Sequence, residues 1–418
     1  MSDARQATVA ELQAQGVLLV EDGNHGEYRP RPDEFADVGT AFIRAADMDS
    51  GRVTFNIASH INDRARQRIT KGIGAPGDVL LSHKGTVGKV ALVPMDAPPF
   101  VCSPQTTFWR TLRTDVLDRG YLYAYLRSRP FAEQLASRAG ETDMAPYVSL
   151  TSQRGLRIPL PPIVTQRHLA RILGALDDKI ELNRRMSETI EATAQALFKS
   201  WFVDLDSDRA ESRLDSRVGS LLDVADLLSG GTPRTDQAEY WGGDIRWASA
   251  KDISQCNGPF LVETERHITS RGLAESPTQM IPAMSSVVVA RGATTGRLAM
   301  LGESMAMNQT CYALTSRGST PFWLYLQLRQ VMGHLVHSAH GSVFDTITTR
   351  TFASAMLPLP PESRRREFDK LVAPLLRQVL RSSREIRTLS EIRDGLLPRL
   401  LSGQLSITTE RPRTGGLR

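Results

Sequence analysis

Several short motifs in this 418-residue sequence contain residues that could bind a cofactor. "GIGAPG", from Gly72, matches the Gly-x-Gly-x-x-Gly pattern of dinucleotide sites, which must follow a strand and open a helix. Here it precedes the apolar run Val79 to Leu81, and Pro76 favours a turn. "GTVGKV", from Gly85, has Val90 where a phosphate loop needs a magnesium-binding Ser or Thr. We therefore expect no nucleotide cofactor.

Three further motifs suggest catalysis or metal binding, and each lacks a necessary group. "APPF" is similar to the Asn/Asp-Pro-Pro-aromatic motif of amino-methyltransferases, but Ala97 cannot hold a target amine. "DDK", residues 177–179, matches half of a metal nuclease site but lies in a predicted helix, where an exposed helix face is the simpler explanation. His334, His337 and His340 are spaced three residues apart, so an unbroken helix cannot bring all three to one metal, and a loop or phosphate contact is the simpler explanation. We expect no catalytic residue and no metal.

An internal duplication organises the chain. Pro-Leu-Pro-Pro occurs at 159–162 and at 358–361, an offset of 358 − 159 = 199 residues. Upstream, "DVLLSHKGTVGKVAL" from Asp78 resembles "SVVVARGATTGRLAM" from Ser286, and both predict a strand, a glycine turn and a strand. Gln105 in "SPQTTFW" parallels Gln309 in "MNQTCYA". The order of these matches is the same in each half, which predicts two similar domains.

The stretches after the repeated prolines have the pattern of paired helices. Steps of four and three residues from Leu169 to Trp201, and the same steps shifted by 199, give ten rungs, of which seven are apolar in both copies. The first helix, from Gln166 to Trp201, would be about 54 Å long. Because the first helix carries the chain from one domain to the other, the second must run back, so we expect an antiparallel pair.

The register of this pair is a second prediction. Antiparallel rungs place Asn183 beside Ile386 and Ser187 beside Ser382, so polar residues would mark the middle and fix the register. Two prolines should disturb the second helix: Pro374 should kink or restart it, and Pro398 should end it.

These patterns predict an α+β fold with two similar domains joined by two long antiparallel helices. The predicted segments are a first domain (1–158), a first helical spacer (159–203), a second domain (204–357), a second spacer (358–405) and a disordered tail (406–418). No apolar run approaches the roughly 18 residues of a membrane helix, and three scattered cysteines indicate reduced thiols, so we expect no membrane partner and a cytoplasmic protein.

Two similar domains on a stiff spacer suit a ligand that is itself a rod with a repeat. Double-stranded DNA is such a ligand, because domains one helical turn or more apart can each meet a groove. The net charge is 51 − 46 = +5, and residues 362–418 alone carry 13 − 7 = +6, which a solvated helix face explains as well as phosphate contact does. A protein-protein adaptor that spaces two partners remains the alternative.

A resemblance to a known family supports DNA as the ligand. "PLPPIVTQRHLARILGALDDKIELNRRMSETIEATAQALFKSWFVD" from Pro159 and "IRTLSEIRDGLLPRLLSGQL" from Ile386 resemble the helical regions of the specificity subunit of type I restriction-modification enzymes. "LLSGGTPRTDQAEYWGGDIRWASAKDI" from Leu227 and "VLLVEDGNHGEYRPRPDEFADVGTAFIRAADM" from Val17 resemble the starts of that family's target recognition domains.

The resemblance implies a non-catalytic subunit in which each recognition domain reads half of a split DNA target and the helices set the spacing. It also implies two copies of an adenine methyltransferase subunit and a translocating restriction endonuclease subunit as partners. For DNA contact we predict the polar residues of the two glycine turns, because Arg and Lys can meet guanine or phosphate. These residues are Ser82, His83, Lys84 and Thr86 in the first domain and Arg291, Thr294 and Thr295 in the second.

Overall fold

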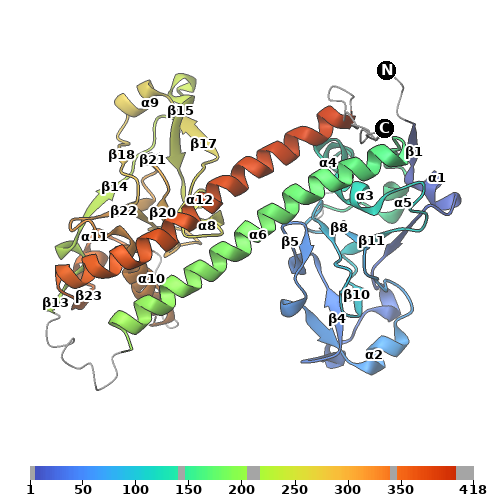
Figure 1. Ribbon diagram of the computed structural model, residues 1–418, viewed down its shortest axis with the longest axis horizontal. Coiled ribbons are helices and arrows are strands. Elements are labelled where there is room, and N and C mark those ends of the chain that lie inside the picture. The colour runs from blue at the N-terminus through green and yellow to red at the C-terminus, as the bar shows by residue number, and fades with distance from the viewer. Residues whose placement is uncertain (1–4, 140–145, 205–216, 339–345, 402–418) are drawn as a thin grey trace, which may run out of the picture. The chain divides into compact units, whose positions relative to one another are not determined.

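The computed structural model describes residues 5–139, 146–204, 217–338 and 346–401. They form two compact units (Figure 1). The first unit contains the described residues up to Asp178 and those from Leu389 onward, and the second contains Lys179 to Thr388. Each unit consists of an α+β domain and part of two long helices, α6 (Ile163–Phe202) and α12 (Glu362–Leu401).

The first domain is built on three sheets, with strand orders β1-β12, β10-β4-β7-β3 and β2-β11-β8-β9-β6-β5. Its strands are β1 (Gln6–Thr8), β2 (Leu18–Asp22), β3 (Phe35–Ala36), β4 (Thr40–Ile43), β5 (Met48–Asp49), β6 (Arg52–Val53), β7 (Ser59–Ile61), β8 (Val79–Ser82), β9 (Val90–Leu92), β10 (Phe100–Cys102), β11 (Thr106–Thr111) and β12 (Arg157–Pro159). Its helices are α1 (Val9–Ala14), α2 (Asp63–Arg68), α3 (Arg119–Leu126), α4 (Arg129–Ala136) and α5 (Leu150–Arg154).

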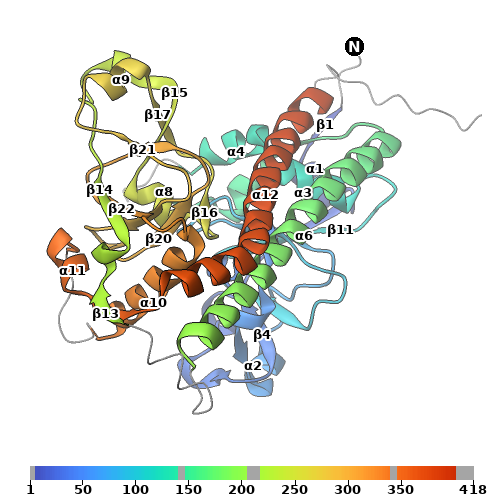
Figure 2. The ribbon, with the colours of Figure 1, turned by 60° about the vertical axis from the view of Figure 1, so that its left-hand side comes forward.

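The second domain also has three sheets, with strand orders β13-β23, β14-β22-β19-β20-β16 and β17-β15-β21-β18. Its strands are β13 (Arg217–Ser220), β14 (Ala225–Ser229), β15 (Trp241–Ala248), β16 (Phe260–Leu261), β17 (Arg266–Ile268), β18 (Met280–Ile281), β19 (Ser286–Val289), β20 (Leu298–Leu301), β21 (Met305–Met307), β22 (Cys311–Ser316) and β23 (Met356–Leu359). Its helices are α8 (Ala250–Gln255), α9 (Ser270–Ala274), α10 (Pro321–Ser338) and α11 (Thr349–Ser354). Figure 2 shows α9 at the end of the β15–β17 ribbon.

The two domains repeat one topology, which confirms the predicted duplication. The antiparallel order β2-β11-β8-β9 recurs as β14-β22-β19-β20. The parallel pair β4–β10 recurs as β15–β21. A short antiparallel pair, β1–β12 or β13–β23, lies directly before each long helix. The repeated Pro-Leu-Pro-Pro therefore runs from the end of a strand to the residue just before a long helix, outside the helix interior where a missing backbone N–H would cost a hydrogen bond.

Each domain has its own apolar core. All side chains of β8 and all those of β19 are buried, as their nearly uninterrupted apolar sequences predict. The largest buried side chains near the helices include Trp109 and Phe131 in the first domain and Trp323 and Phe352 in the second. Both cores extend onto the long helices: Leu169 of α6 packs in the first and Phe368 of α12 in the second.

The long helices pack along the predicted seam. In both copies, every one of the ten rung positions is buried or half-buried. Within the second unit the ring of Phe198 lies 5.8 Å from that of Phe368, near the start of α12. Lys179, earlier on α6, pairs with Glu385, later on α12, at 3.5 Å. The helices therefore run antiparallel there, as predicted.

Two predicted effects of the prolines on the second helix were wrong, the restart at Pro374 and the end at Pro398, while a kink at Pro374 stays a prediction. α12 continues without a break through Pro374, and it ends at Leu401 rather than at Pro398. The Pro374 side chain is exposed, while Val372 and Leu376 on either side are fully buried. Packing of these neighbours holds the helix together where the proline removes one backbone hydrogen bond.

Three smaller expectations concern the thiols, the membrane and the tail. Cys102 and Cys311 are buried free thiols, and Cys256 is half-buried. None of the helices in the described part of the chain is long and apolar enough to cross a membrane. The tail predicted at 406–418 lies outside the described residues.

Candidate nucleic-acid interface

The glycine hairpin of the first domain joins β8 to β9. Gly85 and Gly88 both have positive φ, at 77° and 97°, which residues with a side chain rarely adopt. The Gly88 N–H donates to the Ser82 carbonyl at 2.9 Å, and the Lys89 N–H donates to the Ser82 hydroxyl at 2.9 Å. The two glycines therefore shape a tight loop whose base is held by Ser82.

The structure separates the predicted contact residues of this hairpin into two groups. Ser82 and His83 are fully buried beneath the loop, so their side chains are not accessible at the surface. Lys84 and Thr86 are exposed. The Lys84 Nζ lies 5.8 Å from the ring centre of Tyr147, which is itself 41% exposed. The burial of Ser82 and His83 arises because the sheet extends beyond β8: the His83 N–H donates to the Gln105 carbonyl at 2.9 Å.

His83 is a buried support of the loop. Its Nδ1 lies 3.0 Å from the Val148 carbonyl, and its ring lies 5.5 Å from that of Tyr147. Its Nε2 is 3.6 Å from Asp22 Oδ1, too far for a hydrogen bond. Burial lowers the pKa of the imidazole below its ordinary value, against the opposing effect of the Asp22 carboxylate. His83 is therefore neutral at physiological pH.

The hairpin between β19 and β20 repeats this construction in the second domain. The Gly296 N–H donates to the Val289 carbonyl at 2.9 Å, and Gly292 and Gly296 have positive φ. Arg291 is exposed, whereas Thr294 and Thr295 are half-buried. The Thr295 hydroxyl donates to the Gly292 carbonyl at 2.7 Å, so it also shapes the loop.

Two further segments flank each hairpin, and sequence analysis did not assign them to the site. In the first domain, Val148 N–H donates to the His83 carbonyl at 2.9 Å, and the turn 103–105 bonds to His83 as described. In the second domain, Ile347 N–H donates to the Ala290 carbonyl and Ala290 N–H donates to the Thr310 carbonyl, both at 2.8 Å. We call the three segments the hairpin cluster: residues 83–89, 103–105 and 146–148 in the first domain, and 290–297, 308–310 and 346–347 in the second.

The hairpin clusters expose two glutamines at matching places. Gln105 and Gln309 are both exposed and follow β10 and β21, the equivalent strands of the two domains. The Gln309 Oε1 accepts from the Thr232 hydroxyl. The signal for these residues was already in the sequence, since the two glutamines align in the duplication, but only the sheet pairing places them beside the hairpins.

The residues predicted to fix the helix register are all buried or half-buried. Asn183 and Ser382 are fully buried, and Ser187 and Ile386 are half-buried. The side-chain amide of Asn183 and the hydroxyl of Ser382 have no hydrogen-bond partner, while the Ser187 hydroxyl donates to the Asn183 carbonyl at 2.8 Å. Placing Asn183 beside Ile386 and Ser187 beside Ser382 stays a prediction.

The motifs that resemble cofactor, nuclease or metal sites can be placed in the fold. "GIGAPG" precedes β8 and opens no helix. In "DDK", Asp177 is not simply on an exposed face, because its carboxylate pairs with Arg127 and Arg393. No cluster of metal-ligating side chains occurs among the residues that the structure describes. His340 and the side chains of His334 and His337 lie outside that part.

A family model matches most of the chain. The type I restriction modification DNA specificity domain matches twice, at residues 24–192 and 214–391. These two matches coincide with the two halves of the duplication.

Individual relatives agree with the family match. The chain is 26% identical to the type I restriction enzyme HindI specificity subunit of Haemophilus influenzae, over 87% of this chain and 94% of that protein. It is 23% identical to the MjaIX specificity subunit of Methanocaldococcus jannaschii, over 83% and 82%. The crystal structure of a type I restriction-modification S subunit from M. genitalium has a similar fold, with a TM-score of 0.57, 14% identity, and coverage of 97% and 96%.

Proposed function

Because the chain belongs to the type I restriction-modification DNA specificity family, we propose that each of its two domains reads one half of a split DNA target. The chain is a specificity subunit and not itself the catalyst. The observation that carries the proposal is the repetition of one hairpin cluster in two domains whose helices pair antiparallel. A protein that offers the same surface twice suits a duplex target with two half-sites.

The exposed groups of the hairpin clusters have the chemistry to recognise duplex DNA. Arg291 can meet guanine through two hydrogen bonds or bind a phosphate, and Lys84 can do either as a point charge. Gln105 and Gln309 can form paired hydrogen bonds with adenine. Thr86, Thr294 and Thr295 offer hydroxyls to bases or phosphates. We exclude Ser82 and His83 from direct contact and give them the role of holding the first hairpin in shape.

The same proposal includes the partners. The relatives named above are subunits of type I restriction enzymes, which supports assembly of this chain with two methyltransferase subunits and a restriction subunit in the cytoplasm. In that assembly the chain supplies sequence recognition, and its partners supply methyl transfer and cleavage.

DNA binding is tested by titrating the chain, with its methyltransferase partner, against duplexes at several salt concentrations. Phosphate contacts release counterions, so the logarithm of the affinity should fall linearly with the logarithm of salt concentration. Arg291→Ala should reduce affinity, while the control Arg317→Ala, which removes an exposed pair with Asp226 outside the hairpin cluster, should not. Affinity that does not change with salt would favour a protein-protein adaptor instead.

A further inference from the structure

A tyrosine and an arginine recur at the same place in both domains, outside the hairpin clusters. "YLYAYLR" from Tyr121 aligns with "WLYLQLR" from Trp323, so Tyr123 and Arg127 match Tyr325 and Arg329. The tyrosine lies four residues before the arginine, which puts the two side chains on one face of a helix. The first pair belongs to α3 and its C-terminal cap, and the second to α10.

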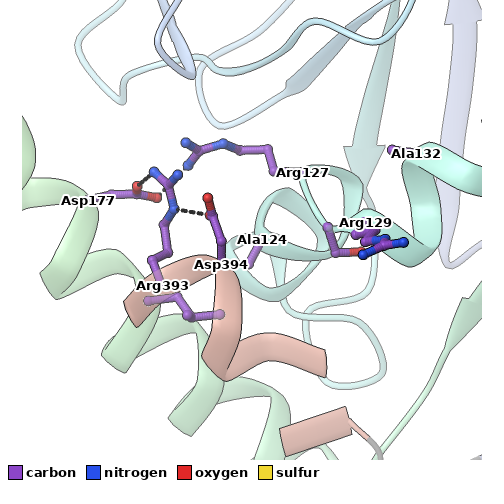
Figure 3. Close-up of a pocket in the computed structure, with 9 residues that line it drawn as sticks. Ala124, Arg127, Arg129, Ala132, Asp177, Arg393 and Asp394 are labelled. Carbon is purple, nitrogen blue, oxygen red and sulfur yellow. Dashed lines mark hydrogen bonds and ion pairs between the residues drawn. The ribbon is translucent and has the colours of Figure 1, made fainter. Parts of the chain in front are cut away.

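In the first unit this pair connects the domain to both long helices. The Arg127 guanidinium donates to the Tyr123 hydroxyl at 2.7 Å and to Asp177 Oδ2 of α6 at 2.5 Å. Asp177 Oδ1 also accepts from Arg393 of α12 at 2.8 Å. The Tyr123 hydroxyl donates to the Gly51 carbonyl at 3.1 Å. Figure 3 shows Asp177, Arg127 and Arg393 at the edge of a cavity of about 360 Å³.

The second unit has an equivalent connection to α6. The Arg329 guanidinium donates to the Tyr325 hydroxyl at 3.3 Å and to the carboxylate of Glu191. Tyr325 is buried, and only 15% of the Glu191 side chain is exposed. These three residues also border a cavity, of about 500 Å³. We call each tyrosine, arginine and carboxylate set a clamp: Tyr123–Arg127–Asp177 and Tyr325–Arg329–Glu191.

The clamps differ physically from the apolar contacts that also attach the domains to the helices. Apolar packing is non-directional, so it tolerates small rotations. A charge-assisted hydrogen bond depends on distance and angle and is stronger when water is partly excluded. Only 20% of the Arg127 side chain and 19% of that of Asp177 are exposed, whereas 47% of the Arg329 side chain is exposed, so water is excluded more fully from the first clamp than from the second. Burial raises the pKa of the Tyr123 hydroxyl to about 12, so the tyrosine remains a donor at physiological pH.

We propose that the two clamps fix the angle at which each domain is held on α6, and thereby set how strictly the protein requires one spacing between its half-sites. The inference rests on the proposed function, and it makes Arg127, Asp177, Arg329 and Glu191 positioning residues. None of the four belongs to a hairpin cluster, so loosening a clamp leaves the chemistry of base recognition unchanged while the domain can rotate on its helix.

The test uses Asp177→Asn and Glu191→Gln, singly and together, in the full chain with its methyltransferase partner. The substrate is a plasmid library in which the native half-sites are separated by the native gap or by one base pair more or less, and methylation is read at base resolution. Loss of the charge-assisted hydrogen bond should raise methylation at altered gaps about tenfold relative to the native gap in Asp177→Asn, and by less in Glu191→Gln, because Arg329 is more exposed than Arg127. The bases of each half-site should not change.

Matched controls remove exposed ion pairs of the same kind. Asp115→Asn breaks the pair with Arg113 in the first unit, and Glu265→Gln breaks the pair with Lys251 in the second. Both control variants should still methylate DNA only where the half-sites are separated by the native gap. Should the clamp variants fail to accumulate, Arg127→Lys and Arg329→Lys, which keep the charge and lose the planar fork, provide the same comparison.

Two results would overturn the proposal while leaving the proposed function intact. One is a clamp variant that folds and still methylates only at the native gap; the other is a change in the bases of a half-site. A wild-type protein that directs methylation to no split sequence would instead remove the proposed function, and this inference with it.

Discussion

Replacing Asp369 with asparagine should change how the stability of the second unit depends on pH. Asp369 lies on α12, is 7% exposed, and accepts hydrogen bonds from the backbone N–H groups of Phe322 and Trp323 at 2.9 and 2.8 Å. It thereby caps the start of α10 from another helix. Burial raises the pKa of this carboxyl to about 6, from an ordinary value of 3.8, despite those two hydrogen bonds.

The sign and size of the effect follow from this pKa. Because the folded carboxyl holds its proton to a higher pH than the unfolded one, the free energy of unfolding falls as the pH rises from about 4 to about 6. The difference between the two pKa values corresponds to about 3 kcal/mol. Asparagine keeps an acceptor oxygen and carries no charge. The free energy of unfolding of Asp369→Asn, relative to that of the wild type, should therefore rise by about 2–3 kcal/mol from pH 4 to pH 7.5.

The assay is urea unfolding of both proteins at the two pH values, followed by tryptophan fluorescence, with the difference between variant and wild type taken at each pH. Other titrating groups cancel in this comparison. The control Asp369→Ala removes both acceptor bonds and should destabilise the unit at either pH by about 1–3 kcal/mol. An Asn variant whose advantage stays constant or shrinks as the pH rises would refute the reasoning about burial.

Three further variants test other parts of the account. Arg291→Ala should weaken binding to the cognate duplex by about 1–3 kcal/mol if the guanidinium meets a base; a change confined to the salt slope, measured by fluorescence anisotropy, would assign it to phosphate instead. Because the pKa of His83 is lowered in the folded protein, the unfolded chain binds more protons, and the first unit should lose stability as the pH falls below about 6.5. Thermal unfolding of His83→Asn should not show this pH dependence. Asn183→Leu should stabilise the helix pair by about 1–3 kcal/mol, since it removes a buried amide without partners, and a loss of stability in urea unfolding would indicate that the amide is hydrated or paired.

The large-scale architecture was predictable because it depends on repetition and periodicity. The offset of 199 residues and the seven shared apolar rungs were sufficient to predict two α+β domains and an antiparallel helix pair. The glycine turns were also predictable, since Gly85 and Gly292 follow strongly apolar strands.

The details that depend on tertiary contact could not be predicted in this way. The sequence around His83 predicts a polar loop residue, but the pairing of β8 with β11 and the nearby Val148 segment bury its side chain. Pro374 predicts a break in the helix, but its buried neighbours Val372 and Leu376 keep α12 continuous. The role of Arg127 depends on Asp177 and Arg393, which lie far from it in sequence.

The most direct test of two-domain recognition is a domain exchange. The full chain, with its methyltransferase partner, would be expressed in a host that lacks type I restriction-modification enzymes. Methylated adenines would then be mapped across the genome by long-read sequencing. The same map would be made after residues 1–157 are replaced by the equivalent domain of a related subunit. If each domain reads one half-site, the map should show a split motif with a fixed gap, and the exchange should change one half and leave the other half and the gap unchanged. A contiguous motif, or an exchange that changes both halves together, would contradict it.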